Sequence, residues 1–471
     1  MSLLFVVIPL FTVVALNLLY KLLTGRDALY ATMLVAVAQV VLAAYSLIQC
    51  VKANASIDSA YIAGFKVDWI AATVLFIIGL IIFVTAILTK EVVKKSVFQF
   101  ANVLLLLMTG MNGIVMATDI FTLYVFIEVT SAASFILIAI NKKRDELEGA
   151  FKYYLMSALA TVMMLLSIAL IHIMTGSTSF ETVGAYIKSL NGSYPTALII
   201  AILLFVGAGS IKSGVVPFHT WVPDAHSSAP SPVSVVLAGV VIKVSGVYAL
   251  MRVYRDVFQN DADLGKVLMV FGILSILVGA LGAIGQTDIK RMLAFSSVSQ
   301  IGYIVLGVAT GSAIGLIGAM LHFFNHATFK SLLFVDAAAI IAQTGTRDMN
   351  KLGGLGERMP VTSTSSVIAL LSMAGIPPLS GFWSKLLVII AVWRVSSGAA
   401  ITALLLSLLT LAYFLLLQKK VFFGKIKPEL KDVKECAPAI KGVEILLSAL
   451  NILVGVAFPL LLIVLNRGGL L

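Results

Sequence analysis

The sequence predicts an all-α polytopic membrane protein. Of its 471 residues, 60% are hydrophobic and only 12% are charged, about half the charged fraction of a typical soluble domain. The mean hydropathy of the chain is +1.07. Apolar windows of about 20 residues, the length of a membrane-crossing helix, recur throughout the sequence. Because these windows are continuous rather than alternating, they exclude an outer-membrane β-barrel.

The apolar windows predict about 14 transmembrane helices, of which the seventh and the twelfth are broken by proline. The segment 179–190 is typical of a short amphipathic helix between two spans. The predicted spans are 3–23, 29–50, 69–89, 97–117, 119–140, 151–175, 195–226, 230–254, 265–285, 288–309, 313–343, 361–395, 399–422 and 443–466.

Lysine and arginine are concentrated in the loops that follow odd-numbered spans, including Lys142, Lys143, Arg144 and the loop 419–441. Positively charged loops stay in the cytoplasm. We therefore expect these loops on the cytoplasmic side of the cell membrane and both termini on its outer side. This asymmetry accounts for the formal net charge of +11, and no nucleic-acid partner is expected. The basic loop also suits anionic lipid or a neighbouring protein of a complex.

Charged side chains occur inside the predicted spans. Glu128 lies halfway through the fifth span, and Lys212 and Lys243 lie within the seventh and eighth. A lysine at the bilayer centre costs about 2.5–3.5 kcal/mol, so it marks a functional site by default. A buried carboxylate becomes neutral or finds a cation, and Lys212 is the natural partner of Glu128. The alternative is a structural ion pair.

Prolines break the seventh span at Pro217 and the twelfth at Pro377 and Pro378. The backbone groups freed by such a break are tolerated in a membrane only where protein or a water-filled cavity satisfies them. The pattern Gly-x-x-Pro-apolar-x-x-aromatic begins at Gly214 and again at Gly375. The two segments are an odd number of spans apart, so they enter the membrane in opposite senses, which indicates inverted repeats. We therefore expect an N-terminal three-helix region 1–96, five-helix repeats 97–254 (spans 4–8) and 265–422 (spans 9–13), and a last region 423–471.

The eleventh span contains His322, His326 and Lys330, spaced i, i+4 and i+8. This spacing places all three on one face of a helix, an arrangement suited to a proton relay. Metal binding by the two histidines is the alternative, but no third ligand is near in sequence. Asp336 lies in the same span off this face, and Lys385 follows the second proline break.

Further polar residues lie close to the first proline break. His219, Asp224 and His226 follow it, and we expect them where ions gain access to the relay. The two cysteines, Cys50 and Cys436, show neither metal-ligand spacing nor a redox motif. We expect no metal and no cofactor.

Five segments carry a resemblance to a known family. They are FIEVTS around Glu128, KSGVVPFHTWVPDAHSSAPSPVSVVLAGVVIK from Lys212 to Lys243, DIKRMLAFSSVSQIGY at 288–303, HFFNHATFKSLLF at 322–334, and GIPPLSGFWSK ending at Lys385. The chain resembles Mrp-type cation/proton antiporter subunits, a family shared with antiporter-like subunits of respiratory complex I and of membrane-bound hydrogenases. The resemblance implies a glutamate–lysine pair at Glu128 and Lys212, a central lysine at Lys243, a central relay at His322, His326 and Lys330, and a terminal lysine at Lys385. Lysine at this last position favours the D-type Mrp subunit or a hydrogenase relative.

We therefore predict a proton-translocating, antiporter-like subunit of a multisubunit complex. The complex would be an Mrp-type Na⁺/H⁺ antiporter or an ion pump related to complex I and hydrogenases, with any redox centre in other subunits. Two alternatives stay open. A stand-alone transporter for an organic solute needs a roomy cavity lined with recognition groups, and a haem-bearing redox subunit needs axial ligands on facing helices.

Overall fold

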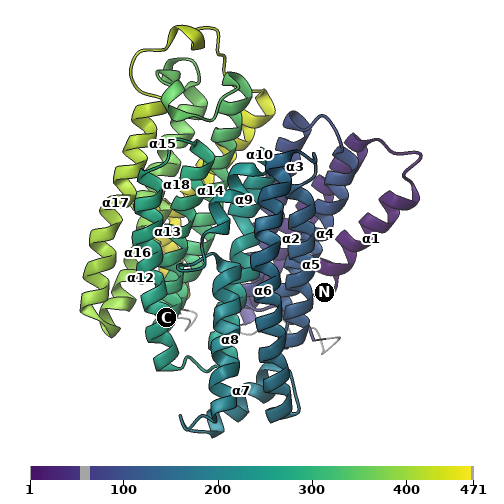
Figure 1. The fold of residues 1–471 in the computed structure, drawn as a ribbon, viewed down its shortest axis with the longest axis vertical. Coiled ribbons are helices and arrows are strands. Elements are labelled where there is room, and N and C mark those ends of the chain that lie inside the picture. The colour runs from purple at the N-terminus through teal and green to yellow at the C-terminus, as the bar shows by residue number, and fades with distance from the viewer. Residues whose placement is uncertain (1, 54–63, 468–471) are drawn as a thin grey trace. The chain divides into compact units, whose positions relative to one another are not determined.

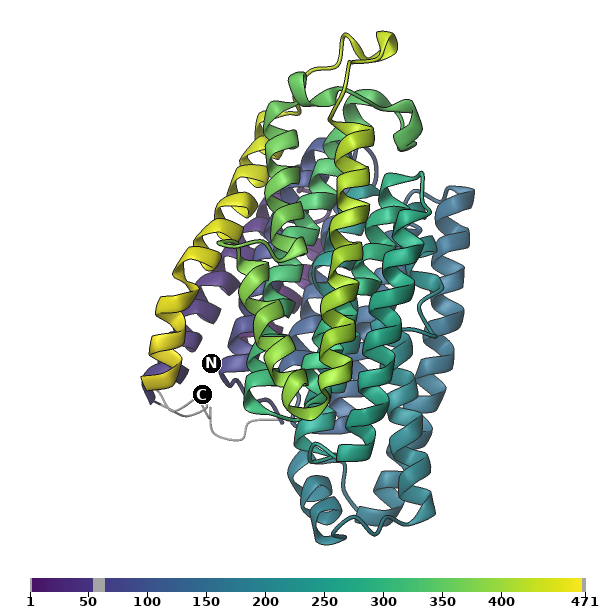
Figure 2. The ribbon, with the colours of Figure 1, turned by 90° about the vertical axis from the view of Figure 1, so that its left-hand side faces the viewer.

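The computed structural model describes residues 2–53 and 64–467, which are helical almost throughout (Figures 1 and 2). Strand-like pairing in this part of the chain is limited to isolated bridges between single residues. Among the described residues, 12 helices are long and apolar enough to cross a membrane. The prediction of an all-helical, multi-span membrane protein is confirmed.

Three predicted spans are not single helices along their whole apolar windows. The window 195–226, which was predicted to be broken, forms Thr196–Ser213 and Trp221–Ser228. The window 3–23 forms a helix over Leu4–Leu18 only, and the window 361–395 is divided into Pro360–Ala374 and Ser380–Val395. The sixth span shows the opposite difference, because its helix begins at Arg144 rather than at 151. Asp145 and Glu146 occupy its first turn, where carboxylates are stabilised by the helix dipole.

The chain divides into two compact units. Unit 1 takes its described residues from Met1–Ala86, Lys95–Gly214 and Val240–Gly265, and unit 2 from Ile87–Lys94, Val215–Gly239 and Lys266–Leu471.

Unit 1 is built around α4 (Val97–Met116), which contacts α1, α2, α5 and η2. Helix α4 is predominantly apolar and is buried along most of its length. Its Asn112 donates hydrogen bonds to the Phe5 carbonyl (2.7 Å) and to Gln39 Oε1 (2.6 Å), so the buried amide is satisfied by α1 and α2. The helices of unit 1 are α1 (Leu4–Leu18), α2 (Gly25–Ala53), α3 (Trp69–Val92), α4, α5 (Ile120–Ile138), α6 (Arg144–Thr175), α7 (Phe180–Ser189), α8 (Thr196–Ser213), the π-helix η2 (Lys243–Tyr248) and α11 (Ala249–Asp256).

Unit 2 is built around α14 (Ala313–Thr344), which contacts α10, α13, α15, α16 and α18. Gly318 permits the close approach of α16, because a Cβ there would lie 2.9 Å from the backbone nitrogen of Val388. The helices that lie wholly or largely in unit 2 are α9 (Trp221–Ser228), α10 (Ser231–Val236), the π-helix η1 (Leu237–Val241), α12 (Ala262–Ile284), α13 (Ile289–Ala309), α14, η3 (Met349–Lys351), η4 (Leu355–Glu357), α15 (Pro360–Ala374), α16 (Ser380–Val395), α17 (Ser397–Val421), η5 (Pro428–Leu430) and α18 (Pro438–Arg467).

Both proline-containing segments interrupt a helix. Gly214, with φ of +64°, directly follows α8, and Gly375, with φ of +85°, directly follows α15. Glycine adopts this left-handed conformation without strain, so it serves as the helix C-cap in both places. Pro217, Pro377 and Pro378 lie in the interruptions that follow.

One local hydrogen-bonding arrangement occurs twice, once in each unit. Asp119 caps α5 by accepting from the Thr122 nitrogen (2.7 Å), and Asp288 caps α13 by accepting from the Arg291 nitrogen (3.0 Å). Each aspartate also forms an antiparallel bridge with the residue 60 positions later in the chain. These bridges are Asp119 with Ser179 and Asp288 with Asp348.

Candidate functional site: a buried lysine and its partners

Lys212 lies in the last turn of α8, immediately before the first helix break, and its side chain is 1% exposed. Its Nζ is 3.2 Å from Glu128 Oε1 on α5. It also donates to Ser131 Oγ at 2.9 Å and to Ser157 Oγ at 2.6 Å. These partners match the three donors of an ammonium group. The structure thus brings together the two charges that the sequence analysis paired.

Glu128 connects this buried lysine to the surface of unit 1. Its side chain is 34% exposed, and its Oε1 also accepts from Thr161 Oγ1 at 2.7 Å. One carboxylate oxygen therefore binds both the ammonium and a hydroxyl, and about a third of the side chain stays exposed.

Lys243 is fully buried and begins the π-helix η2. π-helical turns are rare and often mark functional sites. Gly246 of η2 packs directly on the end of α8, because a Cβ there would lie 2.3 Å from the Ser213 nitrogen and 2.6 Å from the Lys212 carbonyl carbon. The backbones that carry Lys212 and Lys243 are therefore in contact.

This contact makes Gly246→Ala a disruptive substitution. The added methyl group has no room, so we expect α8 and η2 to move apart and the protein to lose about 1–3 kcal/mol of stability, a typical overpacking cost. Thermal unfolding of the purified protein measures the effect. The matched control is Gly442→Ala in α18, where a Cβ meets open space. Equal stability of the two variants would show that the close approach does not constrain this site.

In unit 2, His322, His326 and Lys330 are fully buried on α14. The two histidine rings are nearly parallel, with centroids 6.4 Å apart. His322 Nδ1 lies 2.9 Å from Ser384 Oγ on α16. Lys330 Nζ donates to the Leu293 carbonyl on α13 at 2.8 Å and to the Ser296 hydroxyl. The helix thus presents hydrogen-bonding groups to α13 and to α16.

Lys385 lies on α16 after the second break and is 7% exposed. Its Nζ has no hydrogen-bond partner among the described residues. It lies 4.6 Å from the centroid of the Tyr303 ring on α13, a cation–π contact. In contrast to Lys212, this lysine therefore has an aromatic face in place of a carboxylate.

His219, Asp224 and His226 do not converge on one point. Asp224 Oδ1 lies 2.5 Å from Arg291 Nη1. The buried ring of His226 stacks on Phe334, with centroids 5.0 Å apart. The half-buried His219 ring lies 6.3 Å from that of Phe295. Each residue thus faces a different neighbour within unit 2.

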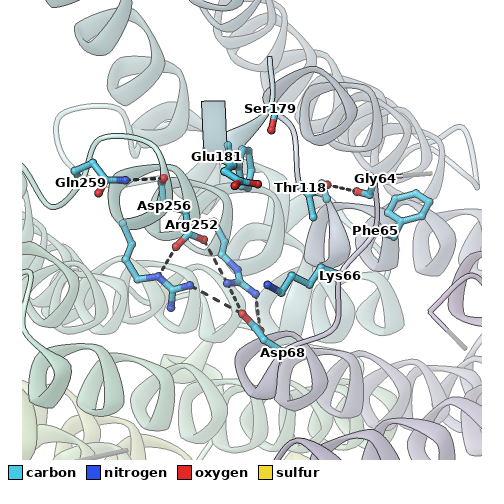
Figure 3. Close-up of a pocket in the computed structure, with 13 residues that line it drawn as sticks. Gly64, Phe65, Lys66, Asp68, Thr118, Ser179, Glu181, Arg252, Asp256 and Gln259 are labelled. Carbon is cyan, nitrogen blue, oxygen red and sulfur yellow. Dashed lines mark hydrogen bonds and ion pairs between the residues drawn. The ribbon is translucent and has the colours of Figure 1, made fainter. Parts of the chain in front are cut away.

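The structure also contains a charged cavity of about 630 Å³ in unit 1 that the sequence analysis did not predict (Figure 3). Arg252 binds Asp68 through two nitrogens, at 2.6 and 2.7 Å, and its Nη1 is 3.4 Å from Asp256. Burial alone would raise the pKa of the Asp68 carboxyl, but the charge and hydrogen bonds of Arg252 outweigh it and lower the pKa to about 2. The cavity is lined by Gly64, Phe65, Lys66, Asp68, Ala117, Thr118, Ser179, Phe180, Glu181, Arg252, Arg255, Asp256 and Gln259.

Asp68→Asn tests this ion pair. The substitution leaves the Arg252 guanidinium, which is 10% exposed, without its bidentate partner. We expect a loss of about 2 kcal/mol at neutral pH, less than for a fully buried pair. Because the folded pKa lies below the ordinary value of 3.8, the contribution of Asp68 is complete above about pH 4 and is lost as the pH falls through about 2. Denaturant unfolding of the wild type and of Asp68→Asn should therefore show a difference in the free energy of unfolding that becomes smaller as the pH falls. Substitution of the exposed Glu91 by glutamine serves as the control. Equal losses of unfolding free energy in Asp68→Asn and Glu91→Gln would refute a stabilising ion pair between Asp68 and Arg252.

Comparisons with known proteins agree with the resemblance noted in the sequence. Residues 117–410 match the family described as NADH:quinone oxidoreductase/Mrp antiporter, TM. NADH-quinone oxidoreductase subunit N of Desulforudis audaxviator is 37% identical over 320 residues, which are 67% of this chain and 63% of that protein. The A-type Na⁺/H⁺ antiporter subunit of Alkalihalophilus pseudofirmus is 37% identical over 383 residues, which are 76% of this chain and 47% of that protein. The chain thus spans about half to two thirds of the length of these two relatives.

The fold matches a solved assembly as well. A chain in the structure of the Mrp complex from Dietzia sp. DQ12-45-1b superposes with a TM-score of 0.90 and 26% identity, covering 99% of this chain and 96% of that chain. The family resemblance is therefore confirmed. This multi-span membrane protein belongs to the NADH:quinone oxidoreductase/Mrp antiporter transmembrane family.

Proposed function

We propose that this chain is the proton-translocating subunit of a multisubunit membrane complex. The complex is an Mrp-type Na⁺/H⁺ antiporter or a redox-driven ion pump related to complex I and hydrogenases, in keeping with the names of the relatives. Protons pass through buried glutamate, lysine and histidine side chains, and the chain itself carries no redox centre.

The observation that carries this proposal is the environment of Lys212. A fully buried ammonium is held by one carboxylate and two hydroxyls beside an interrupted helix. Lysine shifts its pKa readily on burial, so a neighbouring carboxylate decides whether it holds or releases a proton. An ion pair that served stability alone would be poorly placed here, because replacing such pairs by apolar residues is often stabilising.

The exposure of Glu128 supports a place within a larger complex. A carboxylate that is 34% exposed in a membrane span would face hydrocarbon if the chain were alone, at a cost of several kcal/mol. A neighbouring subunit or water held between subunits would remove that cost. Other membrane subunits and lipid are therefore the proposed partners.

Two inverted five-helix repeats, within a total of 14 spans, complete the proposed architecture. The 12 helices of sufficient length, the short α1, and the broken pair α15–α16 together supply this number. The duplicated aspartate caps and bridges in spans 5–6 and 10–11 support the repeats. With this number of spans, the basic loops face the cytoplasm and both termini lie outside.

Within this scheme each unit contributes relay residues. Glu128, Lys212 and Lys243 form the set in unit 1, and His322, His326, Lys330 and Lys385 form the set in unit 2. Interruptions at Pro217 and at Pro377 and Pro378 leave backbone groups available for water or ions. His219, Asp224 and His226 are the proposed access residues.

Purification of the tagged chain from its native membrane tests the proposal. We expect other membrane subunits to co-purify, and the complex in sealed vesicles to move protons when driven by a sodium gradient or by its electron donor. A protonophore should collapse the pH signal. A chain that purifies alone and transports an organic solute without a pH change would overturn the proposal.

A further inference from the structure

Helix α9 is a short part of the interrupted seventh span, and it carries His226, one of the proposed access residues. It has 8 residues and lies between the interruption 214–220 and the junction of Ala229 with Pro230. A helix of this length is marginal by itself, so its position depends on contacts with its neighbours. The last carbonyl groups of a helix also have no partner within the helix. The C-terminal end of α9 therefore needs hydrogen-bond donors from other elements.

Two cationic side chains from elsewhere in unit 2 supply such donors. Arg347 Nη1 donates to the Ser227 carbonyl at 2.6 Å. The ammonium of Lys290, in the first turn of α13, donates to the carbonyl of Ala229, the residue that ends α9. Positive charges at the C-terminal end of a helix satisfy its last carbonyls and interact favourably with the helix dipole. The end of α9 is thus attached to α13 and to the loop after α14.

Burial distinguishes Lys290 from the other cations that reach α9. Lys290 is 4% exposed. The side chain of Arg347 is 47% exposed, and that of Arg291, which pairs with Asp224 of α9, is 38% exposed. Exposed ion pairs contribute little because water and salt screen them, whereas a hydrogen bond is stronger in the low-dielectric interior of a protein. We therefore expect the contact of Lys290 to contribute most to holding the end of α9 on α13.

The end of α9 that Lys290 contacts also carries His226. The His226 ring is fully buried and stacks on Phe334 of α14, with the two ring planes 21° apart. The His226 carbonyl accepts from Ser234 Oγ at 3.0 Å. Phe334 follows Lys330 by four positions, so both lie on one face of α14. A movement of the end of α9 would therefore move the imidazole relative to the face that carries Lys330.

We infer that Lys290 is a positioning residue, whose ammonium holds the C-terminal end of α9 on α13 and thereby fixes the His226 imidazole against α14. Leu293 lies one turn further along α13, and its carbonyl accepts from Lys330 Nζ at 2.8 Å. Neighbouring turns of α13 thus hold both the helix that carries His226 and the Lys330 ammonium. This inference rests on the proposed function for the role of His226, but the position of α9 can be tested without transport.

Carbethoxylation of histidines by diethyl pyrocarbonate, measured for each histidine by mass spectrometry, reports the position of α9. In the unmutated complex we expect the exposed His172 to react at least tenfold faster than the buried His226. Lys290→Met keeps a side chain of similar length but removes the donor, so it should raise the rate at His226 at least fivefold and leave the rate at His322 unchanged. The control Lys351→Met, at an exposed lysine of η3, should change neither rate.

A transport assay on the same variants separates positioning from proton carrying. Arginine keeps a donor and a positive charge but does not release its proton. Lys290→Arg should therefore leave His226 protected and retain at least half of the wild-type transport rate, whereas Lys290→Met should transport at least fivefold more slowly. Loss of transport in Lys290→Arg with His226 still protected would overturn the inference, because Lys290 would then carry protons itself.

Two labelling results would overturn the inference as well. One is an equal rise in rate at His226 and His322 in Lys290→Met, which would show that Lys290 stabilises unit 2 in general. The other is reaction of His226 as fast as His172 in the unmutated complex, a result that needs no variant to fold. A wild-type complex that moves no protons, with His226 released only in Lys290→Met, would contradict the proposed function and leave the position of α9 as inferred.

Discussion

Lys212→Ala is expected to reduce proton translocation at least tenfold while the complex still assembles. The substitution removes the only ammonium that contacts Glu128, Ser131 and Ser157 among the described residues. Alanine cannot carry a proton, so the exchange between the Glu128 carboxylate and the lysine is lost. Proton uptake into vesicles that contain the purified complex measures the effect, and the set of proteins in the complex on a native gel reports assembly.

A matched control separates chemistry from loss of charge. Lys188→Ala removes an exposed lysine of α7 and should leave transport unchanged. Lys212→Arg keeps a positive charge but holds its proton at all working pH values, so it should assemble normally and transport as poorly as Lys212→Ala. Near-normal transport by either Lys212 variant would show that this lysine does not carry protons.

Lys385→Ala is the second substitution expected to stop transport. We expect it to do so without lowering the stability of the protein. The Lys385 ammonium has no hydrogen-bond partner in the described residues and lies 4.6 Å from the centroid of the Tyr303 ring. Its burial is therefore costly, and the cation–π contact returns about 2 kcal/mol at most. We expect Lys385→Ala to unfold at the same temperature as the wild type or higher, yet to be inactive in the vesicle assay.

Two companion variants make the Lys385 result specific. Lys385→Glu restores a titratable group and should retain measurable transport, because a carboxyl can also hold a proton. Tyr303→Phe keeps the ring face and removes only the hydroxyl that donates to the Ala403 carbonyl at 3.0 Å, so transport should persist. If Lys385→Ala and Lys385→Glu both behave as wild type, Lys385 is not on the proton path.

The sequence was sufficient to predict the helices and the pairing of Glu128 with Lys212. A carboxylate and a lysine that both lie within long apolar windows have few other partners, so their contact follows from the cost of burial. The two interruptions were also predictable, because a proline shortly after a glycine favours the end of a helix.

The π-helices could not be predicted from sequence. Apart from Lys243 and Ser245, the segment 237–248 is apolar and compatible with an ordinary α-helix. Its wider turns are accompanied by the contact of Gly246 with Lys212 and Ser213, which are far away in the chain. The sequence shows Gly246 but does not indicate that its backbone packs against Lys212 and Ser213.

Pairs of distant charges were missed for a similar reason. Arg252 and Asp68 are 184 positions apart and each lies near the end of a span, where a charged residue is ordinary. The duplicated bridges did leave a signal, since Thr118-Asp119-Ile120 recurs as Thr287-Asp288-Ile289.

The central claim is that Glu128 and Lys212 act as one proton-transferring element, and transport by a set of three variants tests it most directly. Glu128→Gln and Lys212→Gln each disable the pair, because an amide neither balances the ammonium nor carries a proton. Residues that form one element show strongly non-additive effects, so the double variant should transport about as poorly as the worse single variant, with assembly intact in all three. A double variant whose loss equals the product of the two single losses would show that the residues act independently and would contradict the proposed mechanism.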